Sequence, residues 1–80
     1  GEIDLIFWAP QTETMVFVEV RYRNSKLFGG AAASVDVKKQ QKVKKSAIFY
    51  LHQRNIDTNI RFDVVAFEHN QLNWIESAFS

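Results

Sequence analysis

The 80-residue sequence lacks cysteine entirely and contains only one proline and three glycines. Without cysteine, the chain has no disulfide framework, no thiolate zinc site and no cysteine nucleophile. A small domain without disulfides fits a reducing compartment, so we expect a cytoplasmic protein. No apolar run approaches the roughly 20 residues of a membrane-spanning helix, and the first residues show no signal-peptide pattern. We therefore expect no membrane partner.

The residues that are present indicate a folded domain. Apolar residues make up 46% of the chain and charged residues 24%, which is typical of globular proteins. The length suits a single domain over residues 1–80. The apolar share is rich in Phe, Val and Ile, which favours a core built on a sheet. Because the chain begins at Gly1, directly in strand-like sequence, we expect a domain that is truncated at its N-terminus.

The small net charge of +1 conceals an uneven distribution of charge. Residues 38–45, KKQQKVKK, carry five lysines and no acid, which leaves five basic and nine acidic residues elsewhere. Surface helices commonly mix charges of both signs, because opposite charges one turn apart attract. We interpret this segment as an anion-binding surface suited to phosphates. A solvated helix face is the alternative interpretation.

The pattern of apolar residues and turn residues predicts a β-β-α-β-β order. Ser34 is a good helix N-cap, and Asp36 suits the positive end of a helix in its first turn. The Asn-containing segment 55–59 ends the helix. The predicted strands and helix cover residues 2–8, 14–22, 34–54, 60–68 and 71–76.

At 100° per residue, the predicted helix has two distinct faces. The apolar face comprises Val37, Gln40, Val43, Ala47 and Leu51. The opposite face comprises Lys38, Lys42, Lys45 and Phe49. Lys39 lies off this arc of lysines. We expect these lysines, Lys39 included, to contact a nucleic-acid backbone, with binding that depends on salt and tolerates many sequences.

The first two predicted strands bring two acids together. Side chains alternate along a strand, and the four-residue loop 10–13 sets the register of the hairpin. This register places Asp4 opposite Glu19, and Glu2 opposite Arg21.

Two facing carboxylates in an otherwise apolar hairpin repel each other and lose hydration. A shared proton, a bridge from Arg21, or a divalent cation between the oxygens would each relieve this repulsion. A solvated strand end is the alternative. Asp63, by contrast, is interpreted as a structural acid paired with Arg61 rather than as a catalytic residue.

Several segments in the same order resemble one family. GEIDLI (1–6) followed by FVEVRYR (17–23) resembles the PD-(D/E)xK nuclease motif. FGG (28–30), VDVKKQQKVKKSA (35–47) and RFDVVAF (61–67) extend the likeness to the YraN-type family of small bacterial proteins, which are related to Holliday-junction resolvases and restriction endonucleases. The resemblance implies a restriction-endonuclease-like α/β (α+β) core with a mixed β-sheet. It also implies an additional N-terminal helix, and we expect these 80 residues to begin after it.

The resemblance also implies roles for four residues. Asp4 and Glu19 match the two motif acids, which would hold Mg²⁺ or Mn²⁺. Arg21 occupies the position of the motif lysine, but an arginine does not lose its proton at ordinary pH. Arg21 would instead steady the charge on the scissile phosphate. Gln40 matches a glutamine of resolvase-like relatives, and it would position water or substrate.

The sequence thus predicts a metal-dependent nuclease acting on DNA or RNA. One alternative is a nucleic-acid-binding module on a nuclease fold without turnover, which the arginine at position 21 favours. Another is a protein-interaction domain whose lysines meet an acidic partner. A homodimer is a further possibility that the resolvase likeness raises, although no residue requires it.

Overall fold

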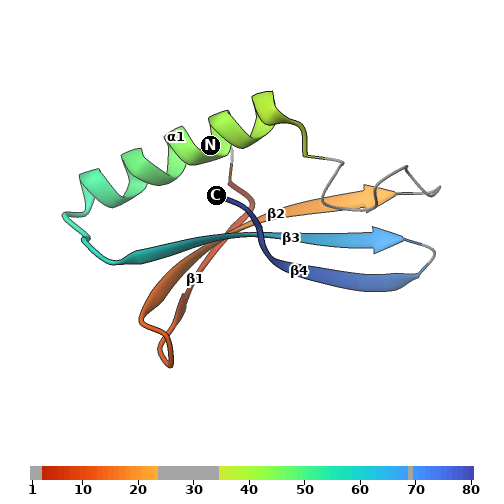
Figure 1. Ribbon diagram of the computed structural model, residues 1–80, viewed down its shortest axis with the longest axis horizontal. Helices are drawn as coiled ribbons and strands as arrows, with labels where there is room; N and C mark the ends of the chain where they lie inside the picture. The colour runs from red at the N-terminus through yellow and green to blue at the C-terminus, as the bar shows by residue number, and fades with distance from the viewer. Residues whose placement is uncertain (1–2, 24–34, 69) are drawn as a thin grey trace.

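A four-stranded mixed sheet carries α1 against one of its faces (Figure 1). The structure is a computed structural model that describes residues 3–23, 35–68 and 70–80. The strands are β1 (Leu5–Ala9), β2 (Thr14–Arg23), β3 (Asn59–Glu68) and β4 (Gln71–Phe79), and the helix is α1 (Val37–Gln53). The predicted β-β-α-β-β order and the mixed sheet are confirmed.

The sheet follows the chain in the order β1-β2-β3-β4. The β1/β2 and β3/β4 pairs are antiparallel, whereas β2 and β3 are parallel. Parallel neighbours need a crossover connection, and α1 lies in that connection. In Figure 1, α1 consequently runs along the sheet on one side of β2 and β3.

The β1–β2 hairpin has the predicted register. Ala9 pairs with Thr14, and Ile6 pairs with Phe17. A turn closes the loop, in which the Glu13 N–H donates to the Pro10 carbonyl at 3.3 Å. The alternation of side chains sends Phe17 towards the helix and Val16 to the opposite face of the sheet.

The main core forms where α1 meets this sheet face. Val43 and Ala47 of the helix are buried against Phe17 and Phe62. The predicted apolar face of the helix is therefore correct at its centre. Val37 is an error, because it is 69% exposed. The buried valine at this end is Val35, which precedes the helix.

The start of α1 differs from the predicted start. Asp36 is the N-cap, and its side chain accepts a hydrogen bond of 2.8 Å from the Lys39 N–H. An aspartate cap satisfies one of the N–H groups that the first turn leaves unpaired. The predicted cap, Ser34, lies outside the described residues. In the described part of the chain, no helix is long and apolar enough to cross a membrane.

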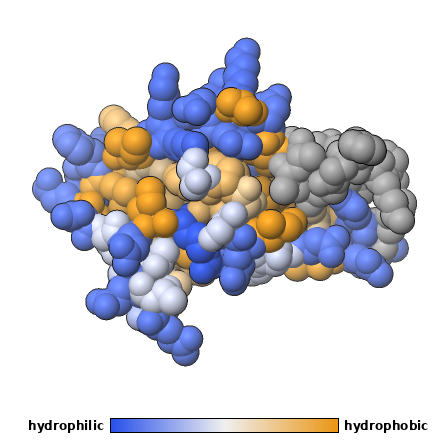
Figure 2. All heavy atoms as spheres, viewed as in Figure 1, coloured by the Kyte–Doolittle hydropathy of each residue, from blue (hydrophilic) through white to orange (hydrophobic). Residues whose placement is uncertain are grey.

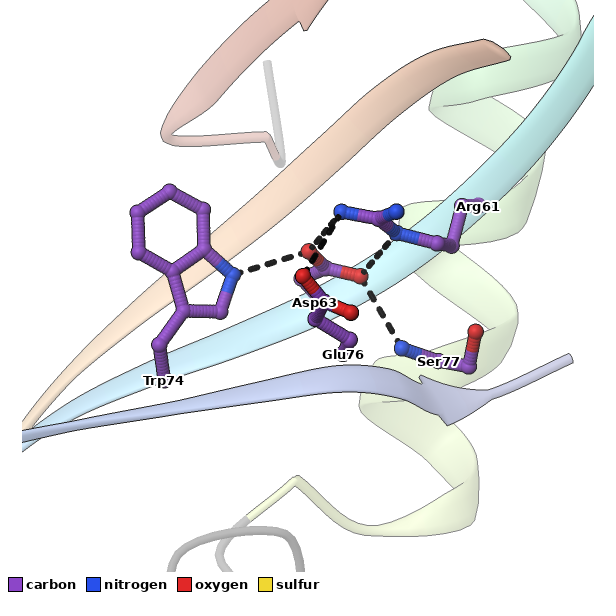
Figure 3. A network of polar contacts seen from close by, with 5 residues as sticks. All are labelled: Arg61, Asp63, Trp74, Glu76 and Ser77. Carbon is purple, nitrogen blue, oxygen red and sulfur yellow. Dashed lines mark hydrogen bonds and ion pairs between the residues drawn. The ribbon is translucent and has the colours of Figure 1, made fainter. Parts of the chain in front are cut away.

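On the sheet face opposite α1, Asp63 organises the β3–β4 pair (Figure 3). Arg61 donates two hydrogen bonds of 2.9 Å to its carboxylate, one from Nε and one from Nη2. Trp74 Nε1 donates a third at 2.8 Å, and the Ser77 N–H a fourth at 3.0 Å. Burial raises the pKa of Asp63, but these hydrogen bonds outweigh it and hold the pKa below its usual value. The predicted structural pair with Arg61 is confirmed.

This network also explains why β4 is longer than predicted. Phe62 pairs with Phe79 and Val64 with Ile75, so residues 76–78 of β4 bulge opposite Asp63. Ser77 has a left-handed φ of 51° and turns its N–H to the carboxylate. Beyond the bulge, pairing resumes and Phe79 stacks on Phe62 with ring centroids 5.2 Å apart.

Replacing Asp63 with Asn is expected to lower the free energy of unfolding by about 3 kcal/mol, because it removes the buried counter-ion of Arg61 and leaves only the exposed Glu76 near that charge. Urea unfolding monitored by Trp fluorescence measures this loss. Glu76→Gln is the control, since Glu76 is exposed and its Oε2 lies 3.7 Å from Arg61 Nη2. The control should lose less than about 1 kcal/mol. Equal losses in the two variants would contradict the structural role of Asp63.

Candidate metal centre

Two carboxyl groups meet on the sheet face that α1 covers. Glu19 lies in the middle of β2 and is only 4% exposed. Asp4 immediately precedes β1 and is exposed, and its Oδ2 accepts a 2.8 Å hydrogen bond from the Val20 N–H. Asp4 thus lies just beyond the last β1–β2 pair, Leu5–Val18, and its side chain reaches β2 beside Glu19.

Burial and proximity shift the two acids in opposite directions. The pKa of Glu19 is raised to about 7, chiefly by burial and also by the hydrogen bond and the negative charge of Asp4. The hydrogen bond with Glu19 lowers the pKa of Asp4, although burial opposes it. A hydrogen bond between two carboxyl groups requires a proton on one of them. The raised pKa of Glu19 and the lowered pKa of Asp4 make Glu19 the acid of the pair that is protonated more readily.

Two cations face this pair. Lys39 of α1 places its Nζ 3.5 Å from Glu19 Oε2, and Arg21 lies two residues beyond Glu19 on the same face of β2. The positive charges of Lys39 and Arg21 both lower the pKa of each acid. At 3.5 Å, the Lys39 contact is an ion pair that is longer than a charged hydrogen bond.

Two buried polar atoms of this site have no hydrogen-bond partner among the described residues. They are Glu19 Oε2 and Arg21 Nε. Buried polar atoms of native proteins are almost always satisfied, and an exception calls for an explanation. An acceptor oxygen and a guanidinium donor suit a cation and a phosphate oxygen, respectively.

The donor set fits Mg²⁺ or Mn²⁺. Over residues 3–23, 35–68 and 70–80, no group of three or more His, Cys, Asp or Glu side chains comes together. Mg²⁺ does not require one, since it commonly binds through one or two carboxylates and completes its shell with water and substrate phosphates. Asp4 and Glu19 provide two such hard oxygen ligands.

The other predicted site residues lie around this pair. The Gln40 side-chain amide is half-buried and donates a 3.0 Å hydrogen bond to the Val35 carbonyl, so it is tied to the segment that enters α1. The expected pair of Glu2 with Arg21 is not tested, because Glu2 lies outside the described residues. The exposed positions of α1 include the lysines Lys38, Lys42 and Lys45.

Sequence reasoning did not place Lys39 beside Glu19. It grouped Lys39 with the nucleic-acid-binding lysines, although away from their arc. One signal was available, because Lys39 lies four residues before the buried Val43 and thus on the same side of the helix. The side chain is 27% exposed.

Comparison with known proteins assigns the family. The model of a family described as "Uncharacterised protein family UPF0102" matches residues 1–67 of the chain. The chain belongs to the UPF0102 family. Among its relatives are proteins named "UPF0102 protein YraN" from Escherichia fergusonii, Escherichia coli and Shigella dysenteriae serotype 1, each 53% identical over 83 residues. The alignments cover the whole of this UPF0102 chain and 62% of the length of these relatives.

The raised pKa of Glu19 predicts that stability depends on pH in metal-free buffer. The folded chain holds the Glu19 proton more tightly than the unfolded chain does. The contribution of Glu19 to the free energy of unfolding is therefore largest below about pH 4.5 and falls as the pH rises towards 7. The shift corresponds to a loss of the order of 3 kcal/mol.

Glu19→Gln is expected to remove this dependence, because a glutamine stays neutral across the range. Urea unfolding at a series of pH values, in the presence of a chelator, measures the difference between the variant and the wild type. Glu76→Gln, at an exposed glutamate, should keep the wild-type slope. A wild-type slope in Glu19→Gln would show that Glu19 does not carry the shared proton.

Proposed function

We propose that this UPF0102 chain forms the site of a metal-dependent nuclease that hydrolyses phosphodiester bonds of DNA or RNA. The observation that carries the proposal is the buried Glu19 beside Asp4, with two cations nearby and no hydrogen-bond partner for Glu19 Oε2 among the described residues. A structural acid would have its oxygens satisfied, as those of Asp63 are. The mixed sheet with its β-β-α-β-β order is consistent with a restriction-endonuclease-like core.

Each residue has a distinct part in the proposed reaction. Asp4 and Glu19 would hold a divalent cation, which when bound supplies positive charge to the phosphate and acidifies water. Arg21 would direct its unpartnered Nε to a phosphate oxygen and steady the charge that develops there. Gln40, anchored through its amide nitrogen, would position water or substrate. Lys39 balances the charge of the two acids.

The exposed lysines of α1 support a polyanionic substrate. Lys38, Lys42 and Lys45 project from successive turns of the helix, and all three are exposed. Figure 2 shows the largely hydrophilic surface on the helix side of the molecule. Such a row neutralises backbone phosphates without reading bases, so it positions a strand rather than selecting a sequence.

One observation favours a second candidate, a nucleic-acid-binding module without turnover. Arg21 stands at the position of the motif lysine, and a guanidinium cannot act as a general base. Under this candidate, the metal and the lysines would bind nucleic acid but leave the strand intact.

Titration of the full-length protein with Mg²⁺ or Mn²⁺ is expected to shift the amide NMR signals around Asp4 and Glu19. Asp4→Asn and Glu19→Gln should each weaken metal binding by roughly ten-fold or more. Even the loss of a residue that only supports a metal ligand has an effect of about this size. Glu76→Gln should bind like the wild type. A flat titration of the wild type would disprove the metal centre.

The same samples, incubated with labelled branched, flapped and single-stranded substrates, separate the two candidates. Cleavage that requires the metal and is lost in Asp4→Asn supports the nuclease. Metal binding without cleavage of any substrate supports the binding module.

Replacing Lys38, Lys42 and Lys45 with Gln is expected to reduce the slope of log affinity against log salt by about 2 to 3, because each lysine displaces a phosphate counter-ion. Fluorescence anisotropy with a labelled oligonucleotide at several salt concentrations gives the slope. Gln41→Ala, at an exposed neutral position of α1, is the control. An unchanged slope in the triple variant would place the nucleic-acid surface elsewhere.

A further inference from the structure

A hollow of about 520 Å³ lies between α1 and the segment around β1. Its volume falls within the range of pockets that hold small organic groups. Most of the surface that lines it is apolar, and it reaches from the strand side to the last turns of the helix. The side chains that line it include Ile3, Ile6, Lys45, Phe49, Tyr50 and Arg54.

The aromatic residues of this hollow differ in how they are held. Tyr50 is fixed, because it packs edge-on against the buried Phe17, with ring centroids 6.0 Å apart. The guanidinium carbon of Arg54 lies 3.9 Å from the Tyr50 ring centroid. Phe49, by contrast, is 64% exposed. An exposed phenyl ring at the rim of an apolar hollow can stack on a planar ligand without rearrangement of the core.

The charge of the hollow favours an anionic ligand. Lys45 and Arg54 contribute two positive charges, and no acidic residue is among the described residues that line it. A planar, apolar group attached to a phosphate matches this combination. Nucleotides combine an aromatic base with an anionic backbone, and proteins bind single strands with basic grooves and stacking aromatic residues.

The hollow also lies at the end of the exposed lysine row. Lys38, Lys42, Lys45 and Phe49 recur at intervals of four, three and four residues, so they form one stripe along α1. The stripe is about 16 Å long at the helical rise per residue. Its first half flanks Lys39, which contacts Glu19, and its second half reaches the hollow. Ile3, on the strand side of the hollow, directly precedes Asp4.

We propose that this hollow binds an unpaired nucleobase, with Phe49 stacking on the base and Lys45 and Arg54 contacting the adjoining phosphates. This inference rests on the proposed function, since it names the substrate class of the carboxylate site as a single-stranded or locally unpaired polynucleotide. The bases of an intact duplex are stacked on one another and cannot enter a side pocket without being flipped out. A strand that follows the lysine stripe can place one base in the hollow, whose Ile3 directly precedes Asp4 in the chain.

The test measures binding of the full-length protein to labelled single-stranded DNA and RNA oligonucleotides, and to a blunt duplex of the same sequence, without divalent cations. We expect the wild type to favour a single strand. Phe49→Ala should weaken single-strand binding by roughly ten- to a hundred-fold and leave duplex binding unchanged. Phe49→Trp, which keeps an aromatic ring, should restore it. The relative effect on the two oligonucleotides shows whether DNA or RNA is the better ligand.

Two controls make the result specific to a base. Ile48→Ala removes an equally exposed apolar side chain that does not line this hollow, and it should bind like the wild type. An abasic strand should bind wild type and Phe49→Ala equally, because it offers nothing to stack. Circular dichroism should show the same fold for all variants.

Failure of the pocket and failure of the proposed function give different results. If single-strand binding is salt-dependent and weakens in the lysine variant but is unaffected by Phe49→Ala, the pocket proposal is wrong and the proposed function stands. Loss of abasic-strand affinity in Phe49→Ala would also overturn the pocket, since it would assign Phe49 to the backbone. Absence of any nucleic-acid binding by the wild type would overturn both.

Discussion

The parallel pairing of β2 with β3 is the constraint on which the rest of this structure depends. The two strands match over ten consecutive pairs, from Thr14–Asn59 to Arg23–Glu68. Because parallel strands cannot be joined by a tight turn, the chain must cross over the sheet, and α1 lies in that crossover. One face of β2 is thereby covered by a helix, which buries Phe17 and Glu19 together. The same arrangement produces both the apolar core and the acid pair.

The two acids that are buried in the described part of the sheet differ in how their carboxyl oxygens are satisfied. Asp63 accepts four hydrogen bonds from a guanidinium, an indole and a backbone N–H, so its charge is compensated and its pKa lies below the usual value. Glu19 has an acidic neighbour and an ion pair with Lys39 at 3.5 Å, and its Oε2 has no hydrogen-bond partner among the described residues. Hydrogen bonds thus satisfy both carboxylate oxygens of Asp63 but leave Glu19 Oε2 without a hydrogen-bond partner among the described residues. Incomplete satisfaction of buried polar groups is characteristic of functional sites.

Local rules predicted the parts of this protein that depend on short segments. The alternation of side chains and a four-residue loop predicted the β1–β2 register, and hence the approach of Asp4 to Glu19. Helical periodicity predicted the burial of Val43 and Ala47. Most of the errors arise where contacts between residues distant in the sequence determine the structure. At the start of α1, Val35 is buried and Val37 is exposed, which helical periodicity alone did not predict. The predicted end of β4 was wrong because the Ser77 N–H donates a hydrogen bond to Asp63 on β3, where the register of the two strands shifts. The contact between Lys39 and Glu19 requires the crossover geometry, which no short segment contains.

The bulge opposite Asp63 has a consequence for how the molecule meets its neighbours. β4 is an edge strand of the described sheet, and edge strands with an unbroken row of N–H and C=O groups invite further strands to add on. Residues 76–78 interrupt that row, since Ser77 adopts a left-handed conformation and directs its N–H inwards to Asp63. The local twist of a bulge further misaligns the edge for a straight partner. The buried acid that joins β3 to β4 thereby also makes this edge a poor template for sheet extension and fibrous aggregation.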